Sequence, residues 1–198
     1  MDSIRIFGYK SFKKLSVQLH PINLLIGANG AGKSNFLSLF EMLGNIYEKR
    51  LGAYVAQVGG VDKLLYQGRK VTDRIAVNLL IAKSEYDLAL LESDGKLIVE
   101  REVVGCYDDV CPLDLVRKNV ITEFQSESSL KDHKEEDLSN YISQIRKFHF
   151  HDTGRRSPFT ADSHIVNDAY RMYEHGENLA AILYRIQREK PMAYRRII

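Results

Sequence analysis

The sequence predicts an α/β fold, in which a mixed sheet with one central strand is joined by an antiparallel β-subdomain and a helical region. Three observations support this fold class. An apolar run at 22–26 leads into a glycine-rich loop, and apolar residues at helical spacing follow that loop. A set of β-rich runs with tight turns occupies 75–104. Beyond about residue 115, apolar stripes on otherwise polar segments favour helices.

Each element rests on a local pattern. The first strands alternate apolar and polar residues, and Pro21 ends the second of them. Asp94-Gly95 predicts a tight hairpin turn, whereas Gly59-Gly60 breaks the chain after the loop helix. Pro191 interrupts or restarts the last helix. The predicted strands are 4–9, 15–19, 22–26, 75–82, 86–91 and 97–104, and the predicted later helices are 138–147 and 177–190.

The glycine-rich loop satisfies the P-loop pattern G-x-x-x-x-G-K-[ST]. Its glycines let the backbone curl around an anion, so that successive N–H groups point inward. Lys33 adds charge for the β- and γ-phosphates, the Ser34 hydroxyl suits Mg²⁺, and the next helix directs its positive dipole end to the same phosphates. Lys33 and Ser34 are therefore the candidate catalytic residues, with Ser34 as metal ligand. The predicted nucleotide-binding residues are Gly27, Asn29, Gly30, Ala31, Gly32, Lys33, Ser34 and Asn35.

The opening of the chain resembles the SMC, RecF and Rad50-type ATPases. The resemblance rests on residues 6–12, which include the turn Lys10-Ser11-Phe12, and on the stretch 20–35, where Asn29 and Asn35 flank the core of the loop. Three later pieces, 59–66, 148–153 and 178–185, are similar to predicted bacterial AAA-family ATPases of the RecF-like group.

The resemblance implies an ABC-type head that binds and hydrolyses Mg-ATP, with two copies sandwiching the nucleotide as a homodimer. It also implies a DNA-linked role, in repair, chromosome maintenance or phage defence, beside a nuclease partner. Lys10 and Lys13 are expected near the nucleotide, as comparable basic residues are in SMC-like heads.

Other motifs of such ATPases do not occur in the sequence: no apolar strand ends in Asp-Glu, and no serine-glycine signature loop is present. Two segments come nearest to an apolar strand ending in Asp-Glu. The first, 103–109, is interrupted by Gly105, and the second, 88–92, is one arm of a predicted hairpin. In SMC-like heads that strand lies far downstream. We therefore expect residues 1–198 to be the N-terminal portion of a longer head, binding ATP without efficient hydrolysis. Its expected regions are a P-loop lobe (1–70), an antiparallel β-subdomain (70–110) and a helical region (115–198).

Two alternatives remain open: a nucleotide-binding regulatory or interaction module that never hydrolyses ATP, and a P-loop kinase for a small substrate. Several further residues are candidates for a functional role, and for each of them the alternative is an ordinary structural or solvent-exposed residue. They are Gln67 and Gln125 for holding Mg²⁺ and water, His149, His151 and Asp152 for metal or phosphate, and Arg155, Arg156, Arg195 and Arg196 for phosphate or DNA backbone.

Composition excludes little. A formal charge of +2 neither favours nor opposes a nucleic-acid partner. Cys106 and Cys111 lack the spacing of a zinc site and fit idle thiols in a reducing compartment. The chain opens without a secretory signal, and no apolar run approaches the length of a membrane span. A cytoplasmic protein without a membrane partner is therefore expected.

Overall fold

The computed structural model describes residues 1–107, 115–133, 136–148 and 169–197. The chain forms two compact units, Met1–Ile145 and Arg146–Ile198. In the described ranges, no helix is both long and apolar enough to cross a bilayer.

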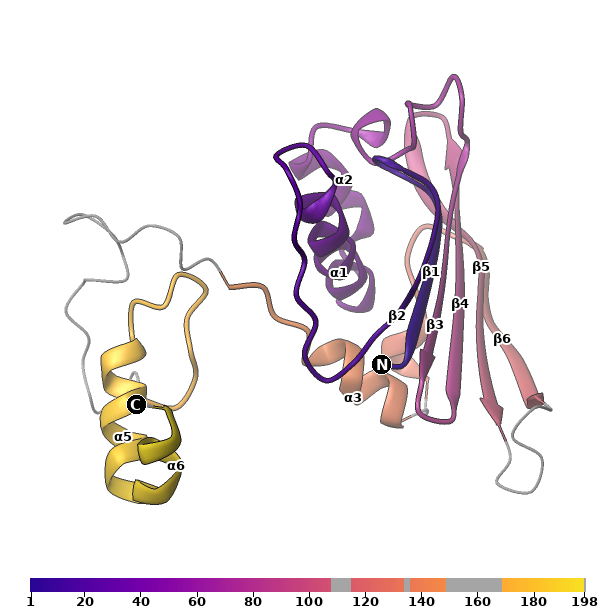
Figure 1. Ribbon diagram of the computed structural model, residues 1–198. Coiled ribbons are helices and arrows are strands. Elements are labelled where there is room, and N and C mark those ends of the chain that lie inside the picture. The colour runs from indigo at the N-terminus through magenta and orange to yellow at the C-terminus, as the bar shows by residue number, and fades with distance from the viewer. Residues whose placement is uncertain (108–114, 134–135, 149–168, 198) are drawn as a thin grey trace. The chain divides into compact units, whose positions relative to one another are not determined.

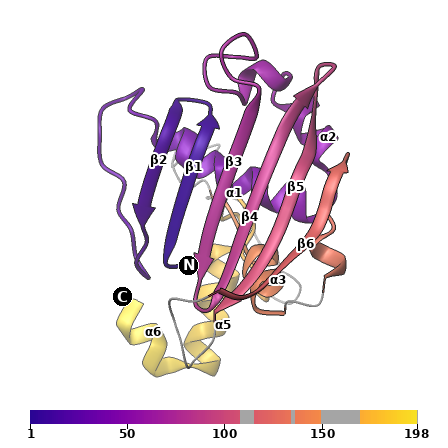
Figure 2. The same ribbon diagram turned by 90° about the vertical axis from the view of Figure 1, so that its right-hand side faces the viewer.

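The first unit contains a six-stranded sheet in the order β2-β1-β3-β4-β5-β6, and every neighbouring pair is antiparallel (Figure 2). Along β3 the side chains alternate between exposed or half-buried and buried, as expected for a sheet with one covered face. The turn between β4 and β5 places Asp94 and Gly95 at positive φ, which confirms the predicted Asp-Gly hairpin. The strands are β1 (Ser3–Tyr9), β2 (Phe12–Gln18), β3 (Arg74–Ile81), β4 (Ser84–Ser93), β5 (Lys96–Tyr107) and β6 (Leu115–Gln125).

Three helices of this unit, α1 (Lys33–Tyr47), α2 (Leu51–Gln57) and α3 (Glu136–Ser143), lie on the same side of the sheet (Figure 1). Two short 3-10 turns, η1 (Val61–Lys63) and η2 (Leu130–Asp132), complete it. The apolar stripe of α1 and the inward residues of the strands together form the core. Fully buried members include Ile4, Ile6, Leu39, Met42, Leu43, Ile46, Leu51, Leu64, Ile75, Leu79, Leu90 and Val99.

A buried carboxylate fixes the chain after β6. Glu102 on β5 is 0% exposed and accepts hydrogen bonds from the hydroxyls of Tyr86 (2.6 Å), Thr122 (2.7 Å) and Ser128 (2.6 Å) and from the Ser129 N–H (3.0 Å). These donors come from β4, from β6 and from the segment before η2. Burial and the adjacent Glu102 charge raise the pKa of Tyr86 well above its usual range. The carboxylate therefore joins three segments that are distant in sequence.

The structure corrects the expectation of a central P-loop strand. Residues 22–26 form no strand, and the sheet is antiparallel rather than mixed. The connection from β2 to α1 runs apart from the sheet (Figure 1). Its side chains are open to solvent: Ile22 is 89% exposed, Leu24 81% and Ile26 85%. The physical reason is that a strand needs a neighbour for its backbone hydrogen bonds, and no described strand lies beside this run.

A second correction concerns the region beyond residue 115, where helices were expected. Its first 11 residues form strand β6, antiparallel to β5. The helical stripe at 138–147 corresponds to α3, which ends at Ser143.

The second unit contains α5 (Leu179–Glu189) and α6 (Pro191–Ile197), so Pro191 begins a new helix as predicted. Asn178, just before α5, is 0% exposed. Its side chain accepts a hydrogen bond from the Tyr173 N–H (2.9 Å) and donates one to the Arg171 carbonyl (2.6 Å), which ties the preceding segment to the helix start.

Candidate nucleotide-binding site

The predicted phosphate loop leads directly into α1. Gly32 stands before the first helical residue with φ of 95°, and no side chain caps this helix end. The first intrahelical hydrogen bond is from the Phe36 N–H to the Gly32 carbonyl (2.9 Å), so the N–H groups before Phe36 have no acceptor within the helix. The first turn also carries no acidic residue. This helix end is therefore suited to a bound anion.

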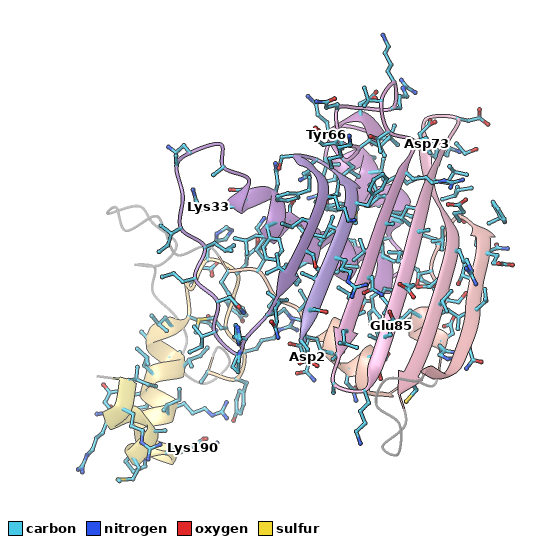
Figure 3. The ribbon with its side chains drawn as sticks, turned by 45° about the vertical axis from the view of Figure 1, so that its right-hand side comes forward. Asp2, Lys33, Tyr66, Asp73, Glu85 and Lys190 are labelled. Atoms are coloured by element: carbon cyan, nitrogen blue, oxygen red, sulfur yellow. The ribbon has the colours of Figure 1, made fainter. Side chains whose placement is uncertain are left out.

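Lys33 lies where the loop meets α1 (Figure 3). Its Nζ donates to the carbonyl oxygens of Gly27 (2.5 Å) and Ala28 (2.7 Å), and the loop is further closed by a hydrogen bond from the Ala31 N–H to the Ala28 carbonyl (3.2 Å). The lysine thus folds back over its own loop. Its ammonium group lies at the loop that the motif assigns to phosphate, while Ser34, the predicted metal ligand, is exposed.

The turn between β1 and β2 supports the loop from the side. The Asn35 amide donates to the Ser11 hydroxyl (2.9 Å). A Cβ added at Gly32 would lie 3.1 Å from Ser11 Oγ and 3.2 Å from Phe12 Cζ. Glycine at this position therefore serves the close approach of the turn as well as the positive φ. The sequence motif indicated the need for Gly32 but not its contact with Ser11 and Phe12.

Below the loop, Ser38 on α1 gathers groups from three elements. Its Oγ is hydrogen-bonded to the Tyr9 hydroxyl (2.9 Å), accepts from Lys10 Nζ (2.8 Å) and donates to the Asn35 carbonyl (2.8 Å). The Tyr54 hydroxyl of α2 donates to the Ser38 carbonyl (3.3 Å). Burial, more than the nearby tyrosine, raises the pKa of Tyr9 above its usual range, so this hydroxyl stays protonated. The cluster connects the first turns of α1 to β1.

Sequence reasoning missed the role of this cluster. A serine on an apolar helix face was the available signal, because such a serine needs a partner when it is buried. Lys10, which is expected near the nucleotide, is hydrogen-bonded to Ser38, and Lys13 lies exposed on β2.

The remaining candidates are dispersed. Gln67 lies in a cavity beside Lys10. Gln125 is exposed at the end of β6, and Arg195 and Arg196 are exposed on α6. No group of three or more potential metal-ligating side chains occurs within the described ranges. Cys106 is a half-buried cysteine on β5. Asp108, Asp109, Cys111, His149, His151, Asp152, Arg155 and Arg156 lie outside the described residues.

Comparison with known proteins gives one positive result. No curated protein matches the sequence. A family model described as AAA ATPase domain matches residues 1–178, which include the whole P-loop, the six-stranded sheet and helices α1 to α3. This match extends over most of the chain and supports an AAA-type P-loop ATPase. The chain belongs to the AAA ATPase domain family.

Proposed function

We propose that this chain binds Mg-ATP at residues 27–35 and is the nucleotide-binding lobe of an SMC/RecF-like ATPase. The observation that carries the proposal is the uncapped start of α1, directly after a glycine-rich loop whose lysine lies over the loop carbonyls. An uncapped helix end with a nearby ammonium group favours a multiply charged anion.

The residues fit the nucleotide's phosphates and a magnesium ion. Backbone N–H groups of the loop and of the first turn of α1 would hold the β- and γ-phosphates, and Lys33 would exchange its two carbonyl acceptors for phosphate oxygens. The Ser34 hydroxyl would hold Mg²⁺, which when bound neutralises charge that develops on the phosphoryl oxygens. Catalysis by this chain's residues is then positioning and charge neutralisation.

Hydrolysis needs a further element, because residues 22–26 have no strand partner among the residues that the structure describes and the sequence contains no apolar strand ending in Asp-Glu. Burying the three most exposed side chains of residues 22–26 would stabilise an ordered strand by about 1.5–3 kcal/mol for each side chain. Ordering five residues costs about 1–2 kcal/mol each. Burial alone thus roughly offsets the ordering cost, and backbone hydrogen bonds from an adjacent strand would favour the ordered state.

We therefore propose that a strand from another segment or another chain pairs with residues 22–26 and supplies the acidic residues. In the complete ATPase two copies would sandwich ATP. By the resemblance, the role would be DNA-linked, in repair, chromosome maintenance or phage defence, with a nuclease as partner.

The second candidate function is a nucleotide-binding module that never hydrolyses ATP. The same observation favours it: within these residues nothing recognisable supplies the acidic strand. The two candidates differ only in whether phosphate is released when the further element is present.

The test is Mg-ATP binding by calorimetry on residues 1–198 and on Lys33→Ala, with phosphate release measured in the same samples. Lys96→Ala is the matched control, since Lys96 is an exposed lysine in the β4–β5 hairpin. We expect the wild type and the control to bind, the Lys33 variant to lose at least tenfold in affinity, and no sample to release phosphate. Equal binding by Lys33→Ala would refute the site, and phosphate release that depends on Lys33 would refute the need for a further element.

A further inference from the structure

The first unit contains a cationic cavity of ≈ 810 Å³ beside the phosphate loop. It is lined by Lys10 from the β1–β2 turn, by Asn35 from the first turn of α1 and by the segment from Asp62 to Lys70. Tyr66 in Figure 3 marks this segment. The volume lies within the range of ordinary ligand sites. Asn35, one of the residues assigned to the nucleotide, is the lining residue that joins the cavity to the P-loop; the other lining residues lie outside residues 27–35.

The charge of the lining is strongly one-sided. Lys10, Lys63, Arg69 and Lys70 are cationic, and Asp62 is the one carboxylate among the lining residues. Asp62 is already engaged: its Oδ1 accepts the Arg69 N–H (2.9 Å), and its Oδ2 lies 3.3 Å from Arg69 Nε. One carboxylate is therefore shared with one arginine, and Lys63 and Lys70 add to the positive charge of the lining. Clustered cations around a cavity favour an anionic ligand.

The wall that carries these cations is fixed to the sheet. Leu65 makes an isolated β-bridge with Tyr9, the Lys10 N–H donates to the Leu64 carbonyl (2.7 Å), and the Tyr66 N–H donates to the Gly8 carbonyl (2.9 Å). The turn that follows has positive φ at Gln67 (57°) and Gly68 (74°). Lys63 and Lys70, on the two sides of this fixed segment, are therefore held at the cavity by backbone contacts.

The lining also indicates which part of a ligand fits. Leu65 is its single apolar residue, and no aromatic ring lines the cavity. A nucleobase would thus find no ring to stack on, whereas phosphate oxygens would find lysines, an arginine and the amides of Asn35 and Gln67.

We propose that this cavity is a second phosphate-binding site, beside the P-loop and sharing only Asn35 with the proposed nucleotide site, that accepts two or more linked phosphate groups. Two sources share this chemistry: the phosphodiester backbone of a nucleic-acid strand and a free polyphosphate. The nucleic-acid source rests on the DNA-linked role proposed above. The site itself does not depend on ATP binding at the P-loop.

The experiment uses the Lys33→Ala background, in which phosphate binding by the P-loop is weakened. The pocket variant adds Lys63→Ala and Lys70→Ala, both exposed side chains whose loss leaves the core intact. The matched control adds Lys96→Ala and Lys190→Ala, which remove the same charge elsewhere (Lys190, Figure 3). The probes are inorganic tripolyphosphate, followed by calorimetry, and a fluorescent single-stranded oligothymidylate, followed by anisotropy over a range of salt concentrations.

We expect the pocket variant to bind at least one probe about tenfold more weakly than the control variant. For the oligothymidylate, losing two phosphate contacts should lower the salt slope by about 1.4, at about 0.7 per contact for a single strand. If the pocket variant loses affinity for the oligothymidylate alone, the ligand is a nucleic-acid backbone. If it loses affinity for tripolyphosphate alone, the ligand is a free polyphosphate. The proposal is overturned if the background protein binds neither probe, or if the pocket and control variants change equally. Loss of ATP binding by Lys33→Ala alone concerns the P-loop and leaves this result unaffected.

Discussion

Gly30 and Gly32 provide a matched pair for testing how the phosphate loop is held. Both have positive φ, 83° and 95°. A Cβ at Gly30 would meet nothing within 4 Å, whereas a Cβ at Gly32 would lie 3.1–3.3 Å from Ser11 and Phe12. Replacing either glycine by alanine therefore places an alanine at positive φ, but only Gly32→Ala adds crowding.

The magnitudes follow from these two terms. A left-handed conformation costs an alanine about 1–2 kcal/mol, and the lower entropy of the unfolded alanine chain returns about 0.4–1 kcal/mol. Gly30→Ala should therefore lower the free energy of unfolding by about 1 kcal/mol. Crowding at a closely packed site typically adds about 1–3 kcal/mol, so Gly32→Ala should lower it by about 2–4 kcal/mol.

The assay is urea unfolding followed by circular dichroism, because the sequence contains no tryptophan to report by fluorescence. The difference between the two variants measures the contact of the loop with the β1–β2 turn. Equal destabilisation would show that the turn does not support the loop at Gly32, and the structural argument for that contact would fail.

Three further results are expected. Glu102→Gln replaces a buried carboxylate that accepts four hydrogen bonds, and it should lower the free energy of unfolding in urea by about 2–4 kcal/mol. The control Glu123→Gln, at an exposed position on β6, should lower it by less than about 0.5 kcal/mol. Because the pKa of Tyr86 is raised in the fold, its contribution to the free energy of unfolding is fully present below about pH 10, where unfolded tyrosine is protonated. That contribution is lost as the pH rises further. Tyr86→Phe should therefore make the alkaline decline in the free energy of unfolding shallower by about 1.4 kcal/mol per pH unit. Asp62→Asn removes the one carboxylate that lines the cationic cavity and should tighten tripolyphosphate binding several-fold in calorimetry. The weakened contacts to Arg69 should lower the free energy of unfolding by about 0.5–1 kcal/mol. Unchanged or weaker tripolyphosphate binding would contradict the assigned charge of the lining.

The elements predicted from local patterns were found close to their predicted positions. Alternation identified β1 and β2, and β-rich composition identified β3 to β5. Asp94-Gly95 identified the β4–β5 turn, and Pro191 marked the start of α6. These features depend on residues within a few positions of one another, so the sequence displays them directly.

Features that depend on distant partners were not predictable in this way. The run at 22–26 has strand-like composition, but pairing requires a neighbour, which composition does not reveal. Glu102 resembles any polar residue of a strand, and its burial depends on donors from β4, β6 and the segment before η2. Similarly, the cations of the second cavity come from positions 10 and 63–70, which are brought together by the bridge between Tyr9 and Leu65 and by the backbone hydrogen bonds beside it.

The unpaired run at 22–26 also sets the apparent affinity of the site that follows it. A phosphate loop is competent only in the fraction of molecules where its preceding run is correctly placed, and the observed dissociation constant rises in inverse proportion to that fraction. A partner that orders this run would therefore tighten nucleotide binding without touching the nucleotide. By reciprocity, bound nucleotide would tighten that partner's binding by the same factor, so assembly and nucleotide occupancy would report on each other.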